Sequence, residues 1–306
     1  MTVRNLFLVA YDDHRMAQSL AEVGRHAREA APEIRSFVIV DRPYRFHRFA
    51  RALRPSLYFA PAVTRRLRPL RGAVLQGRSM AKSAQYEALE AVGVPVPRWA
   101  RLTEREVPDL AEWPAYVVVK PDFGRRGAAV RIMRRERVRW EPIESPIFPG
   151  NTDLIVQEFI YTGRWPVCYR VSTLFGEPLY ALRAEGSRGK RPLEARDAFG
   201  DGGHAIRSST AESTWSLCDD GDIIDLARRA HKALSDVPLL GTDVVRDADT
   251  GRAYVLETNP AGWTWQFRTV MSEALRREHG LDLEAQYDGL RVAGSLLAER
   301  TRRLAR

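Results

Sequence analysis

The stretch GTDVVRDADTGRAYVLETNPAG, residues 241–262, constrains the fold of this chain more than any other feature. Its first half contains the β-branched pair Val244 and Val245, and residues 253–258 form a second run that suits a strand. The residues between the two runs are turn formers, namely Asp247, Asp249, Thr250 and Gly251. The stretch therefore predicts a β-hairpin, and symmetry about residue 250 puts Asp243 directly opposite Glu257.

The polar residues of this hairpin are spaced to share one face. Side chains alternate between the faces of a strand, so Glu257 and Asn259 share a face with Asp243. Val244 and Leu256 are expected to point the other way, into a core. Carboxylate and amide oxygens together at one strand end suit Mg²⁺ held against a nucleotide. The alternative is an ordinary hairpin with polar residues on its solvated face.

Length and composition limit the class of protein. The chain has 306 residues, enough for roughly two or three compact units, and its apolar and charged contents are ordinary for a globular protein. No apolar run approaches the ~20 residues of a membrane span, and the N-terminal run LFLVAY suits a strand rather than a signal peptide. The cysteines, Cys168 and Cys218, make no disulfide framework. We expect a cytoplasmic protein without a membrane partner.

The net charge of +9 points to an anionic partner, but the basic residues are almost all of one type. Of the 48 basic residues only four are lysines, and the rest are arginines. This bias is typical of a GC-rich genome and argues against nucleic acid as the main partner. Where arginine is the common choice, a lysine indicates a place that needs a compact ammonium group.

The N-terminal segment predicts a strand–helix–strand unit with a parallel pair of strands. The strands are expected at 3–10 and 35–41 and the helix at 14–30, whose apolar residues recur at helical spacing. No glycine-rich phosphate loop follows the first strand, which argues against dinucleotide binding. The arginine-rich segment 42–71 is expected to hold short helices and a strand at 57–60.

Two lysines lie at the ends of expected elements in the next part of the chain. A helix is predicted over 79–92, capped by Ser79 or Ser83, and Lys82 lies in its first turn as a solvated charge or as part of an anion site. Residues 115–133 predict strand, loop and strand. Lys120 ends the first strand, where a buried ammonium group needs an anionic partner. Gly124 and Gly127 let the loop approach phosphate oxygens, although a plain hairpin turn also explains them.

A second hairpin, 169–174 with 178–184 around Gly176, carries two arginines. Symmetric pairing puts Arg170 opposite Arg183, and facing arginines repel unless an anion lies between them. The alternative is that each arginine pairs with a local acid such as Glu185 or Glu158. Elsewhere we expect a strand at 154–160, a long loop at 185–214, and helices at 222–234 and 282–304.

These segments follow one another in a familiar order: the Lys82 helix, GVPVP (93–97), VVVKPDFGRRGAAV (117–130), LIVQEFI (154–160), YRV (169–171), GTDVV (241–245) and LETNP (256–260). Over residues 72–275 the chain resembles the ATP-grasp superfamily, and within it the carboxylate–amine ligases of the ribosomal-protein-S6 glutamate-ligase type. The resemblance implies an α/β chain with the α+β ATP-grasp fold. A Rossmann-like domain (1–77) would precede two α+β subdomains (78–153 and 154–306) that clasp ATP.

The resemblance also implies roles for individual residues. Lys120 would contact the ATP phosphates and the adenine edge, and Lys82 would approach the phosphates. The glycines of the loop would close over the β- and γ-phosphates. The remaining cofactor-binding residues, which would lie at the adenine, are Gln157, Glu158 and Phe159. Of these, Glu158 and Phe159 would offer backbone groups to the base. The metal site would consist of Asp243, Glu257 and Asn259. Arg170 and Arg183 would steady the acyl phosphate or the acid substrate.

The sequence departs from the family at several places, and the Arg/Ser/Asn segment that the family uses near the substrate has no clear counterpart. Cys168 stands where these ligases usually carry an aspartate that binds ribose. The glycine-rich loop carries Arg125 and Arg126. After Asn259 the segment PAGWTWQF replaces a run of small residues, and Trp263 and Trp265 either line an acceptor pocket or pack the C-terminal helix.

The expected activity is that of an ADP-forming ligase that needs ATP and Mg²⁺, with Mn²⁺ as the alternative metal. It would activate a carboxylate as an acyl phosphate for attack by an amine, on an amino acid, a peptide or a small-molecule acid. A homo-oligomer is compatible with this activity. Two alternatives stay open, namely an ATP-binding protein with a regulatory role and an ATP-grasp kinase that releases a phosphorylated product.

Overall fold

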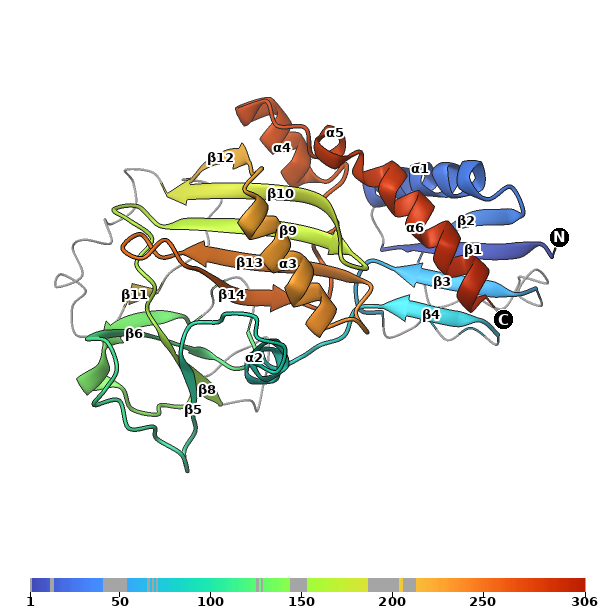
Figure 1. The fold of residues 1–306 in the computed structure, drawn as a ribbon. Helices are drawn as coiled ribbons and strands as arrows, with labels where there is room; N and C mark the ends of the chain where they lie inside the picture. Colours follow the sequence, from blue (N-terminus) through green and yellow to red (C-terminus); the bar gives the residue numbers. More distant parts are fainter. Residues whose placement is uncertain are drawn as a thin grey trace.

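The structure is a computed structural model that describes residues 2–11, 14–40, 54–64, 67, 69, 71–124, 127, 129–143, 153–186, 204–205 and 213–305. Most of the arginine-rich segment 42–71 and of the expected loop 185–214 lies outside these residues, as do Arg125 and Arg126. Three sheets make up the described part of the chain. Figure 1 shows them along an elongated molecule, with both termini at one end.

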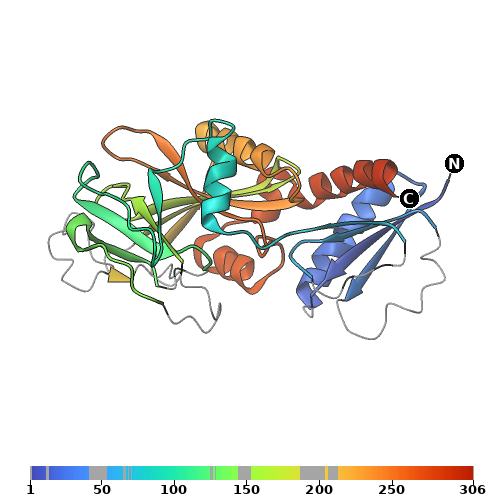
Figure 2. The same cartoon turned by 90° about the horizontal axis from the view of Figure 1, so that it is seen from below.

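The N-terminal sheet is parallel, as the strand–helix–strand pattern predicts. Its strand order is β2-β1-β3-β4. The strands are β1 (Arg4–Ala10), β2 (Ile34–Val40), β3 (Ser56–Ala60) and β4 (Ala73–Gln76). Helices α1 (His14–Ala30) and α6 (Gly289–Leu304) pack together and lie on the same side of this sheet (Figure 2). The last helix of the chain therefore returns to the N-terminal part.

The second sheet is small and antiparallel, in the order β11-β7-β6-β8-β5. Its strands are β5 (Trp99–Leu102), β6 (Tyr116–Pro121), β7 (Arg131–Arg134), β8 (Leu154–Glu158) and β11 (His204–Ala205). Helix α2 (Lys82–Glu90) precedes it, and a 3-10 helix, η3 (Arg135–Arg137), follows β7. Strand β8 pairs with β5 and β6, so this sheet continues past residue 153, where the sequence suggested a subdomain boundary.

The third sheet is antiparallel, in the order β12-β10-β9-β13-β14. Its strands are β9 (Val167–Leu174), β10 (Glu177–Gly186), β12 (Ser213–Leu217), β13 (Leu239–Arg246) and β14 (Ala253–Asn259). Helix α3 (Gly221–Ala233) crosses one face of it (Figure 1). Thr173 of β9 bonds to His231 of that helix, so Arg170, at odd spacing from Thr173, points to the opposite face.

One apolar core joins the N-terminal sheet to the third sheet. It includes Leu6 and Leu8 of β1, Leu174 and Leu182 of the third sheet, and Leu297 of α6. The remaining helices are α4 (Val270–His279) and α5 (Leu283–Tyr287). Within the described residues, none of the helices combines the length and the hydropathy that a membrane crossing requires. The two sheets are therefore held as one unit, and the small sheet has its own core around Val117 and Val119.

Two expected helix boundaries are wrong. Helix α2 begins after Ala81 without a side-chain cap, so neither Ser79 nor Ser83 caps it as expected. The expected helix 282–304 is split into α5 and α6 at Asp288, which has a left-handed φ of 51°. An isolated αL residue ends a helix because its backbone cannot continue the right-handed turn.

Candidate active site

The hairpin of β13 and β14 has the predicted register at its polar end. Asp243 pairs with Glu257, and Gly241 pairs with Asn259. A bulge follows Asp243, so Val244 pairs with Val255. Because of this bulge, Val255 joins Val244 in the core, and the expectation that Leu256 would point into the core is wrong.

Asp243 is held by an arginine from the neighbouring strand. Arg170 of β9 pairs with Asp243, and its Nε and Nη2 donate to Oδ1 and Oδ2 at 2.7 and 2.8 Å. The charge of Asp243 raises the pKa of Arg170. Asn259 Nδ2 lies 3.5 Å from the same carboxylate. This two-pronged contact fixes the orientation of the carboxylate on the face away from α3.

The donor set of the hairpin fits Mg²⁺. Among the described residues no group of three His, Cys, Asp or Glu side chains could hold a metal ion, so the set depends on the amide of Asn259. Arg170 uses two of the roughly four lone-pair sites of an ionised carboxylate, which leaves acceptor capacity on Asp243. The side chain of Glu257 is 28% exposed, and its nearest cation, Lys82 Nζ, is 3.9 Å away. Hard oxygens with space for phosphate and water match the preference of Mg²⁺.

Lys82 lies at the start of α2 and turns toward the glycine-rich loop. It is buried, and its Nζ donates to the carbonyl oxygen of Gly124 at 3.1 Å. The Asp122 carboxylate accepts from the backbone N–H and the hydroxyl of Ser83 at 2.8 and 2.9 Å. An acid at a helix N-terminus is favourable, so Asp122 fills the role that a cap would have. It also ties the loop to the helix that carries Lys82.

Lys120 points into a buried polar network. Its Nζ donates to the Tyr86 hydroxyl at 2.9 Å, to Gln157 Oε1 at 2.8 Å and to the Leu256 carbonyl oxygen at 3.4 Å. Burial lowers the pKa of Lys120 to about 8, and the charge of Glu257 opposes that shift. Lys120 is therefore a buried ammonium group whose neutral acceptors keep its charge available to an anion.

Tyr86 is the residue of this network that we did not anticipate from the sequence. Its hydroxyl donates to the Leu256 carbonyl oxygen at 2.6 Å and accepts from Lys120 and from Gln157 Nε2. Burial raises the pKa of Tyr86. Its position four residues after Lys82 puts both side chains on one face of α2, which is the signal that could have identified it. The network joins α2, the small sheet and the hairpin of β13 and β14.

Of the expected phosphate loop and adenine segment, Gly124 contacts Lys82 and Gln157 contacts Lys120. In the loop, Gly127 has a φ of 64°, a conformation that glycine adopts without strain. The Gln157 side chain is fully buried in the Lys120 network rather than open to a ligand. The Glu158 N–H donates to the Arg98 carbonyl oxygen at 2.7 Å, and Phe159 follows the end of β8.

Arg170 and Arg183 do not face each other, so that expectation is wrong. A register shift between Pro178 and Tyr180 pairs Arg170 with Leu182, and Arg183 with Tyr169. The two guanidinium groups therefore lie on opposite faces of the sheet. Arg183 pairs with Glu185 at 2.8 Å, which is the alternative that the sequence left open.

The remaining departures from the family also have defined positions. Cys168 shares the face of Arg170, and burial raises the pKa of its thiol to about 12. Trp265 is buried in the core that α6 closes, and its Nε1 donates to Ser19 Oγ at 2.9 Å. Trp263 is 59% exposed. Trp265 therefore has the packing role that the sequence allowed, whereas Trp263 does not pack in this core.

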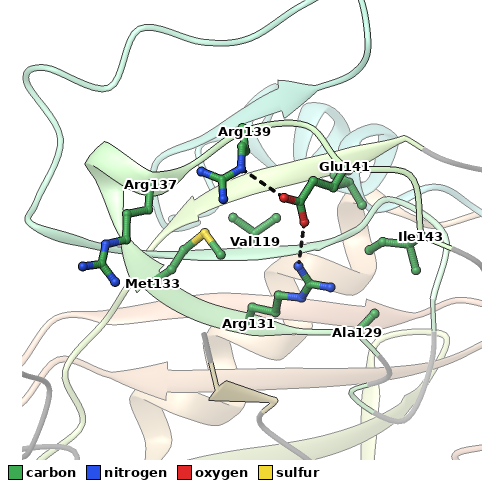
Figure 3. A pocket seen from close by; sticks show the side chains of 9 residues that line it. Val119, Ala129, Arg131, Met133, Arg137, Arg139, Glu141 and Ile143 are labelled. Carbon is green, nitrogen blue, oxygen red and sulfur yellow. Dashed lines mark hydrogen bonds and ion pairs between the residues drawn. The ribbon is translucent and has the colours of Figure 1, made fainter. Parts of the chain in front are cut away.

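A cavity of about 480 Å³ lies on the face of the small sheet opposite to the face that carries Lys120. In Figure 3, Arg131 and Arg139 point toward Glu141, while Arg137 points away from it. The cavity includes Val119, whose side chain is on the opposite face of β6 from that of Lys120. It is therefore separate from the lysines and carboxylates of the candidate active site.

Comparison with known proteins identifies the fold. Neither a family model nor a curated protein matches the sequence. Among solved structures, a D-alanine–D-alanine ligase from Bacillus anthracis in complex with ATP is similar at a TM-score of 0.52 and 14% identity, over 99% of both chains. The D-cycloserine synthetase DcsG is similar at a TM-score of 0.55 and 16% identity, over 97% of this chain and 99% of that one.

A third similar structure is the ATP-grasp ligase PsnB complexed with a minimal precursor. Its TM-score is 0.53 at 15% identity, over 96% of this chain and 99% of PsnB. Sequence identities this low are evidence for a shared fold and not for a shared activity. The agreement spans nearly the whole chain and all three sheets, and the chain has the ATP-grasp fold.

Proposed function

We propose that the protein is an ATP- and Mg²⁺-dependent ligase that joins a carboxylate to an amine and forms ADP. The observation that carries this proposal is the register pair of Asp243 and Glu257 beside three cationic side chains, Lys82, Lys120 and Arg170. Such a cluster can hold the phosphates of a nucleotide and the metal that accompanies them. The relatives with this fold include enzymes whose names describe ligation.

The reaction divides into two displacements. A carboxylate oxygen of the acid attacks the γ-phosphorus, the bond to the bridging oxygen breaks, and ADP leaves. The amine nitrogen then attacks the acyl carbon, phosphate leaves with the bonding electron pair, and the amine releases a proton to solvent. The side chains of the site supply position and opposite charge rather than a covalent nucleophile. The Arg170 side chain is 37% exposed, so it is partly accessible to the acid while its Nε and Nη2 hold Asp243.

Mg²⁺, when bound, neutralises phosphate charge and polarises the γ-phosphoryl group. Asp243, Glu257 and Asn259 are the residues that would hold it. Arg170 orients Asp243 for this role, because its two donors fix the plane of the carboxylate. Lys120 would meet the nucleotide from the opposite sheet, held there by Tyr86 and Gln157.

A coupled ADP-release assay across amino acids, short peptides and small acids tests the proposal, with mass spectrometry of the products. A ligase gives ADP, phosphate and a product whose mass equals the two substrates less one water. A kinase gives ADP and a phosphorylated product instead. Glu257→Gln is the matched control, because it keeps the shape of the side chain and removes its charge.

The second candidate is an ATP-binding protein with a regulatory role. The observation that favours it is the pairing of Arg170 with Asp243, since this pair partly neutralises a carboxylate that a catalytic metal needs. Calorimetry with ATP separates the two candidates. Tight binding of ATP without ADP release from any acid and amine pair supports the regulatory candidate and rejects the ligase.

A further inference from the structure

Trp263 has an unusual combination of exposure and backbone conformation. Within the described residues it is the one aromatic among the exposed large apolar side chains, at 59% exposure. Its φ is 65°, in the left-handed region that bulky residues rarely adopt. Phe175 also has a positive φ, but it lies in the tight turn between β9 and β10, where a hairpin requires that conformation. Trp263 lies in no such turn, so its strained backbone needs another explanation.

The loop that carries Trp263 is clamped by the N-terminal sheet. The Val63 N–H donates to the Ala261 carbonyl oxygen at 2.9 Å, and the Arg78 N–H donates to the Pro260 carbonyl oxygen at 2.8 Å. Gly262 packs so closely that a Cβ there would lie 2.1 Å from the Pro61 carbonyl oxygen. The surrounding structure therefore imposes the conformation of Trp263, and the ring is presented by a rigid support.

Tyr11 completes a small aromatic surface with Trp263. The two rings stack with centroids 4.9 Å apart and planes inclined by 29°. The Tyr11 hydroxyl donates to the Val63 carbonyl oxygen at 2.9 Å, which fixes its ring to the same clamp. We call this pair the aromatic shelf. Tyr11 covers one face of the indole, so the solvent-exposed surface of Trp263 is the remainder of its ring.

The aromatic shelf borders the hairpin of β13 and β14. The next residue, Thr264, lies against Gly241, where a Cβ would be 2.2 Å from its Cγ2. The Thr264 carbonyl oxygen accepts from Tyr180 at 2.7 Å and from Ser172 at 3.3 Å. Gly241 pairs with both Asn259 and Ser172. This contact therefore lies two residues along each strand from the pair of Asp243 and Arg170.

The shelf also lies at the edge where α/β sheets bind ligands. Tyr11 follows the end of β1, Pro61 follows β3, and Gly77 follows β4, so the carboxyl ends of parallel strands meet the loop of Trp263. Ligands of open α/β sheets bind outside the carboxyl ends of the strands. The position of the shelf therefore agrees with a binding role rather than with packing, which Trp265 already supplies.

We propose that the aromatic shelf of Tyr11 and Trp263 receives a flat side chain of one of the two substrates of ligation. This inference rests on the proposed function, and it specifies the substrate class. A rigid, exposed indole presents a π face, on which flat groups such as an aromatic ring or a guanidinium group stack. A branched or puckered aliphatic group of equal size gains only contact area from such a surface.

Binding of free amino acids to the full chain tests the shelf. Saturation-transfer NMR and calorimetry are run with Mg²⁺ and a non-hydrolysable ATP analogue. L-phenylalanine and L-cyclohexylalanine form the matched pair of probes, because their side chains share size and connectivity but only one is flat. L-arginine tests the guanidinium group. We expect phenylalanine or arginine to bind at least ~10-fold more tightly than cyclohexylalanine, as stacking on an exposed aromatic group predicts.

Three variants separate the ring from the fold. Trp263→Ala is expected to reduce the preference to ~2-fold or less, while Trp263→Phe retains most of it. Trp263→Gly removes the ring and also suits the positive φ, so it keeps the loop folded. All three should bind the ATP analogue as the unsubstituted chain does, which excludes general damage to the site.

Equal binding of phenylalanine and cyclohexylalanine would overturn the shelf, as would binding of no probe or a preference that survives in Trp263→Ala. Failure of the proposed function has a different signature. In that case the flat probes still bind with the Trp263-dependent preference, but no combination of acid and amine releases ADP.

Discussion

Arg170 and Asp243 form a two-pronged ion pair across neighbouring strands of the third sheet. Arg170 Nε and Nη2 lie 2.7 and 2.8 Å from the two oxygens of Asp243. The pair is partly buried, with the Asp243 side chain 12% exposed and that of Arg170 37% exposed. The arginine thus lies between a proposed metal ligand and the space open to a substrate, and either partner depends on the other for its orientation.

We expect Arg170→Ala to lower kcat by ~10²-fold or more, because it removes a positive charge where charge develops and releases the Asp243 carboxylate. Steady-state ADP release with saturating ATP measures the effect. Arg183→Ala is the matched comparison, since Arg183 lies on the adjacent strand, on the other face, and pairs with Glu185. Its effect on kcat should be the smaller one. An equal loss in both variants would contradict this geometry.

Glu257→Gln should abolish most ATP turnover and leave the fold intact. Glu257 is partly exposed, and its ion pair with Lys82 is 3.9 Å long, beyond hydrogen-bond length, so the free energy of unfolding should change by only ~0.5 kcal/mol. Loss of a hard anionic ligand should weaken Mg²⁺ binding, which titration with Mn²⁺ reports directly. Glu185→Gln is the control from the same sheet. Turnover like that of the unsubstituted protein in Glu257→Gln would reject the metal assignment.

Lys120→Arg is expected to weaken ATP binding by ~1–3 kcal/mol although the charge is kept. The compact ammonium group has three donors that fit Tyr86, Gln157 and the Leu256 carbonyl oxygen, and a planar guanidinium group cannot occupy the same buried space. Calorimetry at pH 7 measures the loss. Unchanged affinity would mean that Lys120 has only a structural role at the end of β6.

The same lysine predicts how ATP binding depends on pH. Burial lowers the pKa of Lys120 to about 8, so the side chain loses its charge as the pH rises through that value. Affinity for ATP should therefore fall above pH 8 in the unsubstituted protein. In Lys120→Arg the dependence should disappear, because arginine stays charged throughout this range. A pH profile that is identical in both proteins would assign the effect to another group.

His231 predicts an acid sensitivity that has nothing to do with the active site. Burial lowers the pKa of His231 to about 4, and its ring lies 2.6 Å from Thr173 Oγ1 and 2.9 Å from the Val237 carbonyl oxygen. The unfolded chain binds this proton near pH 6.5, so stability is full above that pH and is lost as the pH falls toward 4. The expected loss is ~3 kcal/mol.

Urea unfolding at pH 7 and pH 4.5 measures this loss. His231→Gln removes the titrating group, so its free energy of unfolding should be lower at pH 7 and should fall less between the two pH values. Carboxylates contribute to the acid response of both proteins, and the difference between them isolates His231. An equal fall in both would show that His231 is not responsible.

Local patterns in the sequence were enough for many of the elements and for the register of the β13–β14 hairpin. Helix 14–30 follows from apolar spacing alone, and the pairing of Asp243 with Glu257 follows from turn residues within the hairpin. Both depend on interactions between residues close in the chain, where geometry leaves few choices. The order of the motifs indicated the ATP-grasp fold, which agrees with the similar structures.

The tertiary structure alone decided the partners of the charged groups. Arg170 meets Asp243, 73 residues away, because β9 and β13 are neighbours, and a bulge near Pro178 turns Arg183 to the other face. Asp122 replaces the expected serine cap of α2 from 39 residues away, and Tyr86 joins Lys120 across two elements. The sequence determines which side chains carry charge. Packing determines which of them share a face, because a shift of one residue in a strand reverses every side chain.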